Sequence, residues 1–217
     1  MSNICPLCSS HEVVEYHQDK KRPYLQCQRC DLVFVPKRHH LSQQLEKAEY
    51  DKHENDLNDE GYLTFLSRAS APLLDYLSNL PDNDIMGLDF GCGPAPALAK
   101  VLTKNGFYTS IYDPYYFPDE SALKQEYDFV CCTEVVEHFN NPQQGFDTLI
   151  DLLKPSGVLV IMTKLVIDDE RFKNWHYKND PTHISFFSEK TFEYIADKYQ
   201  LTLQKVDKDV LFLHKST

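Results

Sequence analysis

Apolar residues recur every three or four positions over residues 61–80, a spacing that predicts an amphipathic helix. Pro72 lies inside this stretch and is expected to bend the helix or to break it into two pieces. A shorter helix is predicted over residues 41–49, within the polar stretch that precedes it.

Beyond residue 80, short apolar runs alternate with helical segments. Predicted strands cover residues 85–90, 107–112, 127–132 and 157–163, and predicted helices cover 94–104, 142–153 and 188–198. Asn141 is the expected cap of the second helix, and Pro142 is its first residue. Two strands, 201–206 and 210–213, follow the last helix and are joined by a tight turn. This alternation predicts an α/β fold with a doubly wound, mostly parallel, Rossmann-like sheet and an antiparallel closing hairpin.

Composition and charge narrow the class of protein. Of the 217 residues, 42% are hydrophobic and 25% are charged, values typical of a soluble globular protein. The formal net charge of −11 repels phosphate backbones, so nucleic acid is not an expected partner. No run approaches the 18 or so apolar residues that a membrane span requires, and the first residues lack the basic and apolar regions of a signal peptide. We therefore expect a cytoplasmic protein that does not enter a membrane.

Four of the seven cysteines lie within the first 30 residues, as two Cys-x-x-Cys pairs. Eighteen residues separate the pair Cys5 and Cys8 from the pair Cys27 and Cys30, which is the spacing of a four-thiolate zinc site. So short a segment buries little apolar surface, and a zinc ion can supply about 10 kcal/mol of coupled folding energy. Redox-active pairs and free thiols are the alternatives. A closed four-cysteine site leaves no open position for water, so its expected role is structural or in docking a partner protein.

The charge distribution places a boundary after this zinc-ribbon-like module. Residues 1–38 hold six basic and four acidic side chains, net +2, which leaves −13 for the rest of the chain. We expect three parts: the zinc-binding module at 1–38, a linker with a short helix at 39–60, and the α/β domain at 61–217.

A glycine turn follows the first predicted strand of the α/β domain. Asp89 precedes Gly91-Cys-Gly93, whose glycines let the backbone approach a ligand at the carboxyl edge of the sheet. A dinucleotide-binding loop carries a third glycine where this chain has Pro96, so an NAD-dependent oxidoreductase is disfavoured. An acidic residue beside the turn suits a cationic ligand, and S-adenosylmethionine is such a ligand, with its ammonium and sulfonium groups.

A second carboxylate, Asp113, ends the next predicted strand, 24 residues after Asp89. A carboxylate at this position can accept hydrogen bonds from both ribose hydroxyls of an adenosine. The alternative is a turn aspartate before Pro114.

Four motifs resemble, in order and spacing, those of the class I S-adenosylmethionine-dependent methyltransferases. They are Asp89-Phe-Gly-Cys-Gly, Tyr112-Asp113, the segment 127–139 (Tyr-Asp-Phe-Val-Cys-Cys-Thr-Glu-Val-Val-Glu-His-Phe) and Leu153-Lys-Pro-Ser-Gly157. The resemblance covers roughly residues 60–213 and implies an enzyme that uses S-adenosylmethionine. It places Asp89, Gly91 and Gly93 at the methionine end of the cofactor, Asp113 at the ribose, and Thr133 and Glu134 beside the cofactor.

The chain departs from this family between the second and fourth strands of the family's fold. Only thirteen residues, 114–126, stand where the family has a helix, a strand and an acidic residue that contacts adenine. The third strand is therefore either vestigial around 121–123 or missing, and no adenine contact is assigned.

Candidate catalytic groups cluster in residues 175–188, after the last parallel strand. This segment holds His176, His183, the only tryptophan and several other aromatic residues, and we expect it to cover the methyl group of the cofactor. A similar segment occurs in sugar and small-molecule methyltransferases that are preceded by a cysteine-rich zinc module. A base is needed where the acceptor loses a proton, so the candidates are His183, His176 and His138. For each histidine, the alternative is a structural hydrogen bond.

Three further residues lie before the core of the α/β domain, namely Tyr50, His53 and Tyr62. They are placed to close over the cofactor, and Tyr62 is the candidate cofactor-binding residue among them. The alternative for all three is an exposed helix position.

These features predict an enzyme that transfers a methyl group from S-adenosylmethionine to a small-molecule acceptor, by O- or C-methylation, such as a sugar or another metabolite. The alternative is a non-catalytic S-adenosylmethionine-binding module that docks a partner protein through its zinc knuckle. A nucleic-acid methyltransferase is disfavoured because Thr133-Glu-Val-Val follows the strand 127–132, where an Asn-Pro-Pro-Tyr-like motif would be expected.

Overall fold

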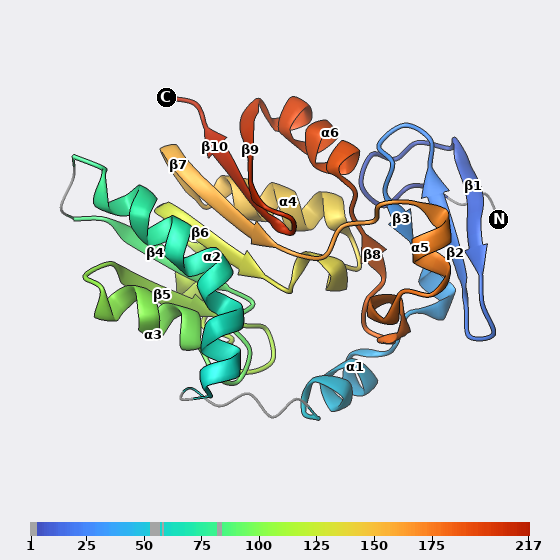
Figure 1. The fold of residues 1–217 in the computed structure, drawn as a ribbon, viewed down its shortest axis with the longest axis horizontal. Coiled ribbons are helices and arrows are strands. Elements are labelled where there is room, and N and C mark those ends of the chain that lie inside the picture. Colours follow the sequence, from blue (N-terminus) through green and yellow to red (C-terminus); the bar gives the residue numbers. More distant parts are fainter. Residues whose placement is uncertain (1–3, 53–56, 58, 82–83) are drawn as a thin grey trace.

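The computed structural model describes residues 4–52, 57, 59–81 and 84–217. Its strands form two β-sheets (Figure 1). The larger sheet has six strands, in the order β5 (Tyr108–Tyr112), β4 (Met86–Phe90), β6 (Tyr127–Thr133), β7 (Leu153–Met162), β10 (Val210–Lys215) and β9 (Leu201–Asp207). The first four of these run parallel, and β10 pairs antiparallel with both β7 and β9. The predicted α/β class, with a mostly parallel Rossmann-like sheet and an antiparallel closing hairpin, is confirmed.

Helices cover both faces of this sheet, because successive residues of its central strands point to opposite sides. The covering helices are α2 (Glu60–Ser78), α3 (Ala97–Lys104), α4 (Pro142–Asp151) and α6 (Glu189–Tyr199). Phe129 of β6 belongs to the core formed with α2 and α3, whereas the next residue, Val130, belongs to the core formed with α4 and α6. The side chain of Asn141 caps α4, as predicted, and that of Ser188 caps α6.

Helix α2 runs without interruption past Pro72, so the predicted break into two pieces is wrong. The helix buries one face, formed by Leu66, Ala69, Ser70, Leu73 and Leu77. A proline inside a helix costs about 3 kcal/mol, whereas each buried leucine contributes about 1.5–3 kcal/mol. Burial of this face therefore outweighs the cost of the proline.

The smaller sheet belongs mostly to residues 1–38, which we call the cysteine module. Its strand order is β1 (Val13–Gln18), β2 (Pro23–Cys27), β3 (Val33–Phe34) and β8 (Ser185–Phe186), with every pair antiparallel. The strand β8 comes from the segment after β7, and Figure 1 shows it beside β3. Backbone hydrogen bonds therefore join the cysteine module to the rest of the chain.

The remaining elements are short and lie in the connections between strands and helices. They are the helices α1 (Gln43–Tyr50) and α5 (Asp169–Lys173) and the 3-10 turns η1 (Lys37–His39), η2 (Glu120–Leu123), η3 (Val136–His138) and η4 (His176–Asn179). Residues 113–126 are all described and contain only η2 and one bridge between Asp113 and Phe117, so the third strand of the resembling family is missing here. Across the described ranges, no helix has the length and apolar character needed to cross a membrane.

Replacing Gly87 by alanine is expected to destabilise the larger sheet. Gly87 of β4 faces the ring of Phe129, and a Cβ atom added there would lie 2.0 Å from the Cε2 and Cζ atoms of that ring. Phe129 is fully buried, so the added methyl group forces neighbouring side chains from their rotamers, at a cost of about 1–3 kcal/mol. Urea denaturation measures this cost, and an unfolding midpoint equal to that of the wild type contradicts the prediction.

Candidate active site and cysteine cluster

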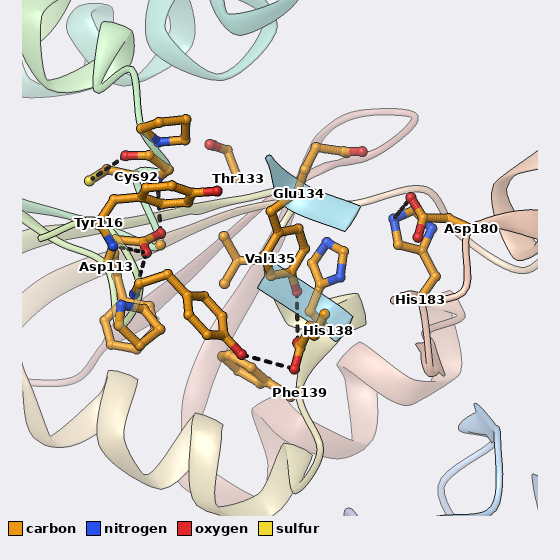
Figure 2. Close-up of a pocket in the computed structure, with 18 of the residues that line it drawn as sticks. Cys92, Asp113, Tyr116, Thr133, Glu134, Val135, His138, Phe139, Asp180 and His183 are labelled. Carbon is orange, nitrogen blue, oxygen red and sulfur yellow. Dashed lines mark hydrogen bonds and ion pairs between the residues drawn. The ribbon is translucent and has the colours of Figure 1, made fainter. Parts of the chain in front are cut away.

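A cavity of about 970 Å³, called the central cavity below, opens where the parallel strands β4, β5 and β6 end. The strands β5 and β6 lie on opposite sides of β4, and ligands of open α/β sheets bind where the strand order reverses in this way. Figure 2 shows Cys92 and Asp113 on one side of the cavity and His138 and His183 on the other. The cavity is therefore the candidate active site.

The turn after β4 exposes backbone to the central cavity. Gly91 (φ 75°) and Gly93 (φ 63°) both line the cavity, in the left-handed conformation that glycine adopts without strain. A Cβ atom on Gly91 would lie 2.5 Å from Cγ2 of Val135, whereas a Cβ atom on Gly93 would have no neighbour within 4 Å. The first glycine is required for packing, and the second leaves the backbone open to a ligand.

Asp113 lies next to this turn, at the end of β5. Its Oδ2 atom accepts a hydrogen bond from the N–H of Gly93 at 3.0 Å, and its Oδ1 atom accepts from the N–H groups of Tyr115 and Tyr116 at 2.8 and 3.0 Å. Asp113 therefore stabilises a turn, and it also lines the central cavity. The three backbone donors hold its carboxylate in one orientation.

Asp89, just before the glycine turn, is buried and does not line the cavity. Only 2% of its surface is exposed, and its Oδ2 atom accepts a hydrogen bond from the N–H of Ala99 in α3 at 3.3 Å. Burial raises the pKa of Asp89 to about 7. Tyr62 of α2 does line the cavity, and burial, followed by the nearby charge of Asp89, raises the pKa of Tyr62 to about 12.

Thr133 and Glu134, at the end of β6, both line the central cavity. Glu134 has a left-handed conformation (φ 53°), and its N–H donates to the carbonyl oxygen of Met162 at 2.7 Å. Burial, followed by the charge of Glu137, raises the pKa of Glu134 to about 8. Among the described residues, the buried Oε1 atom of Glu134 has no hydrogen-bond partner. A ligand with a cationic or hydrogen-bond-donating group would supply one.

His138 and His183 both line the central cavity, with ring centroids 4.8 Å apart. Nδ1 of His183 lies 2.7 Å from the carbonyl oxygen of Tyr177, and since a carbonyl only accepts, Nδ1 carries the hydrogen and Nε2 keeps a lone pair. This Nε2 atom lies 3.8 Å from Oδ2 of Asp180. Burial, followed by repulsion from His138, lowers the pKa of His183 to about 3, so its ring is neutral near pH 7.

His176 is exposed and does not line the cavity; its Nε2 atom lies 3.2 Å from Nζ of Lys164. Of the three candidate histidines, the structure thus brings two together and leaves the third outside. Tyr50 lines the cavity, as Tyr62 does, whereas His53 lies outside the described residues.

Glu137 was not among the predicted site residues, although it adjoins His138 in the chain. It is fully buried and accepts hydrogen bonds from Oγ1 of Thr163 at 3.0 Å and from the hydroxyl of Tyr177. Burial raises the pKa of Glu137 to about 7. The signal that could have found it is the repeat of glutamate at positions 134 and 137, directly before a histidine.

The helix α1 supplies part of the cavity wall through the predicted Tyr50 and also through Glu46, which was not predicted. Glu46 of α1 accepts hydrogen bonds from the hydroxyl groups of Tyr50 and Tyr115, at 2.8 and 3.0 Å, and all three residues line the cavity. Tyr115 follows β5, far from α1 in the sequence, so this contact arises only in the folded chain.

The four cysteines of the cysteine module converge on one point. Their Sγ atoms all lie within 4.8 Å of one another, with Cys5 and Cys30 at 3.4 Å and Cys8 and Cys27 at 3.4 Å. All four are free thiols. Around a tetrahedral zinc ion with Zn–S bonds of about 2.3 Å, sulfur atoms are about 3.8 Å apart, so this cluster is a plausible zinc site.

Comparisons with known proteins agree with this geometry. Residues 62–206 match the model of a protein family described as a methyltransferase domain. The ubiquinone biosynthesis O-methyltransferase of Rickettsia bellii is 29% identical over 148 residues, which are 55% of this chain and 61% of that protein. The mitochondrial ubiquinone biosynthesis O-methyltransferase of Dictyostelium discoideum is 46% identical over 99 residues, 45% of this chain and 30% of that protein. The chain thus spans about three-fifths, or less, of the length of these relatives.

A solved structure shares the fold over nearly the whole chain. It is the 1,6-didemethyltoxoflavin-N1-methyltransferase of Burkholderia thailandensis, determined with 1,6-didemethyltoxoflavin and S-adenosylhomocysteine bound. The match has a TM-score of 0.54 and 13% identity and covers 93% of this chain and 98% of that one.

Proposed function

The chain belongs to the methyltransferase domain family and is a class I S-adenosylmethionine-dependent methyltransferase, and we propose that it methylates a hydroxyl group of a small molecule bound in the central cavity. Curated relatives named as O-methyltransferases support an oxygen acceptor over a carbon acceptor. A hydroxyl that is methylated must lose its proton, and the unprotonated Nε2 atom of His183, at the wall of the cavity, can accept it.

The observation that carries the cofactor site is the carboxylate of Asp113, held by three N–H groups beside an open glycine turn. We assign the ribose hydroxyls of S-adenosylmethionine to Asp113, and its methionine end to the backbone at Gly91 and Gly93. Thr133 and Tyr62 complete the cofactor wall in this proposal. These positions fit a ligand with one end rich in hydroxyl groups and the other in charge.

Buried carboxyl groups favour a cationic ligand. Burial raises the pKa of Asp89 and of Glu134; the charges of Lys164 and Arg68 act in the opposite direction on Glu134 but do not offset its loss of water. An ammonium or sulfonium group near Glu134 would stabilise its charged form and satisfy its unpartnered oxygen. In this proposal Asp89 does not contact the ligand. It lies behind the glycine turn, where its electrostatic field acts on the ligand and its carboxylate accepts a hydrogen bond from α3.

S-adenosylmethionine supplies, when bound, a methyl group on a cationic sulfur whose departure requires no proton. The chain's own residues therefore orient the acceptor and remove its proton. In our proposal, Nε2 of His183 takes this proton, and the carboxylate of Asp180 stabilises the imidazolium that forms. His138 lines the same wall and contacts the acceptor, whereas the exposed His176 takes no part in this step.

We also propose that the cysteine module holds one zinc ion through Cys5, Cys8, Cys27 and Cys30. Four thiolates fill a tetrahedral ion, so the metal would be structural. The proposed organisation is a zinc-binding module at 1–38, a linker at 39–60 and the methyltransferase domain at 61–217.

Replacing Asp113 by alanine is expected to weaken S-adenosylmethionine binding at least about thirtyfold, since two hydrogen bonds to a charged group are each worth roughly 1.5 kcal/mol or more. Isothermal titration calorimetry with S-adenosylmethionine, S-adenosylhomocysteine and NAD measures this effect. Asp119→Ala, an exposed aspartate that caps η2 and does not line the cavity, is the matched control. Equal affinity of the Asp113 variant and the wild type contradicts the assignment, and binding of NAD alone contradicts the proposed reaction.

A further inference from the structure

One arginine of the cysteine module is buried in the loop that carries His183. The side chain of Arg22, in the turn between β1 and β2, is only 6% exposed. Its Nη1 atom donates to the carbonyl oxygen of Pro181 at 2.9 Å, and its Nη2 atom lies 2.7–2.9 Å from the carbonyl oxygens of Lys178, Asp180 and His183. Four carbonyl groups of residues 178–183, which we call the clamped segment, therefore converge on a single guanidinium group.

The same turn holds the start of this segment through a second buried contact. Nζ of Lys178, a residue that is 5% exposed, donates to Oδ2 of Asp19 at 3.1 Å. Oδ1 of Asp19 accepts from the backbone N–H of Arg22 at 2.9 Å, and Oδ2 also accepts from the hydroxyl of Tyr24 at 3.0 Å. These bonds hold the pKa of Asp19 well below its usual range, which keeps its charge opposite Lys178.

The clamped segment carries two groups of the central cavity, Asp180 and His183 (Figure 2). Arg22 itself does not line the cavity, so any effect on the reaction passes through the segment. Carbonyl groups that point toward one another repel, and each costs about 1–3 kcal/mol when it is buried without a donor. Without the guanidinium group, the segment would turn its carbonyls to solvent and carry His183 with them.

We infer that Arg22 is a positioning residue for methyl transfer, through which the cysteine module sets the geometry of Asp180 and His183 on the acceptor side of the cavity. The expected effect on turnover rests on the proposed function, whereas the expected effect of Arg22 on the conformation of the clamped segment does not. The cysteine module then contributes to the reaction through Arg22 and not through its cysteines.

Two variants test the clamp, and a third serves as the control. Arg22→Met keeps the length of the side chain and removes every donor. Arg22→Lys keeps the charge but can supply at most three donors to the four carbonyls. Arg38→Met changes an exposed arginine of the same module. Zinc content and the main unfolding transition are recorded for each variant, so that a folding defect is recognised.

Turnover is the first measurement. We expect Arg22→Met to lower kcat at least about tenfold while the Kd of S-adenosylmethionine stays within about twofold, because Asp113 and the glycine turn lie outside the clamped segment. The kcat of Arg22→Lys is expected to lie between those of Arg22→Met and the wild type. The kcat of Arg38→Met is expected to equal that of the wild type. Wild-type kcat in Arg22→Met overturns the inference, and so does a loss of cofactor affinity that equals the loss of kcat.

Two measurements need no turnover. Proton–nitrogen NMR of protein labelled with 15N-histidine follows the titration of His183, which faces His138, Asp180 and Arg22 and contacts Tyr177. Exposure of the segment in Arg22→Met is expected to move the pKa of His183 from about 3 toward the ordinary value near 6.5. Trypsin is expected to cleave after Lys178 at least about tenfold faster in that variant. An unchanged titration and unchanged cleavage overturn the inference, whereas wild-type protein that binds no S-adenosylmethionine contradicts only the proposed function.

Discussion

Replacing Cys27 and Cys30 together by serine is expected to abolish zinc binding, to unfold the cysteine module and to lower methyl transfer at least about tenfold. The two cysteines supply half of the sulfur atoms that lie within 4.8 Å of one another. Two thiolates do not retain the ion, and structural zinc accounts for roughly 10 kcal/mol of folding free energy in small zinc-binding domains.

Loss of the module also affects the larger domain. Leu7, Leu32 and Phe34 of the module belong to the same apolar core as Phe187 and Phe192. Unfolding of the module exposes those two rings, opens the pairing of β3 with β8 and releases the segment that Arg22 holds. We therefore expect the main unfolding transition to shift to a lower temperature and kcat to fall with it.

Metal analysis, differential scanning calorimetry and turnover measure the three effects on one preparation. Cys131→Ala is the control, since Cys131 lies in β6, is buried and is not part of the cluster. It is expected to lower the main transition slightly and to leave one zinc ion bound. A double variant that melts and turns over like the wild type contradicts both the zinc assignment and the structural role of the metal.

The succession of strands and helices along the chain, and the place of the cavity at the carboxyl edge of the sheet, could be predicted because local patterns specify them. The glycine turn and Asp113 follow from strand ends that meet at one edge of a parallel sheet, and both lie at the central cavity. Element ends were less predictable: β7 begins at Leu153, four residues before the predicted start. Pro72 misled the prediction because the apolar face of α2 supplies a larger energy than the one lost backbone bond.

Contacts between distant segments could not be predicted from local patterns. Nothing in the two residues of β8 indicates that they pair with β3, about 150 positions earlier in the chain. In the sequence, Arg22 is one of six basic residues of the cysteine module, and nothing distinguishes it from the others. Only the folded chain shows its four carbonyl partners. Glu137 was seen as part of a motif, but its burial and its bond to Tyr177 depend on the segment after β7.

Replacing His183 by glutamine is expected to lower kcat at least about a hundredfold and to leave the Kd of S-adenosylmethionine within about twofold. Loss of a positioned base typically costs a factor of about 10² to 10⁴ in rate. Glutamine keeps a similar volume and can still donate to the carbonyl of Tyr177, but it cannot take a proton at the position of Nε2. His214→Gln, on β10 and outside the cavity, is the control and is expected to retain wild-type kcat. An undiminished kcat in the His183 variant removes this histidine from the mechanism.

The pH dependence of stability gives an independent check on the same residue. The folded-state pKa of His183, about 3, is lower than the value near 6.5 expected in the unfolded chain. Below pH 6.5 the unfolded chain therefore binds a proton that the folded chain does not, and the free energy of unfolding falls as the pH decreases toward 3. His183→Gln removes this contribution, so urea denaturation between pH 7 and pH 4 is expected to show a shallower loss of stability in the variant than in the wild type. Equal slopes would mean that the folded-state pKa of His183 lies near its ordinary value and is not lowered by burial. Such a ring is still mostly neutral at pH 7, so its role as the base would then be decided by the effect of the substitution on kcat.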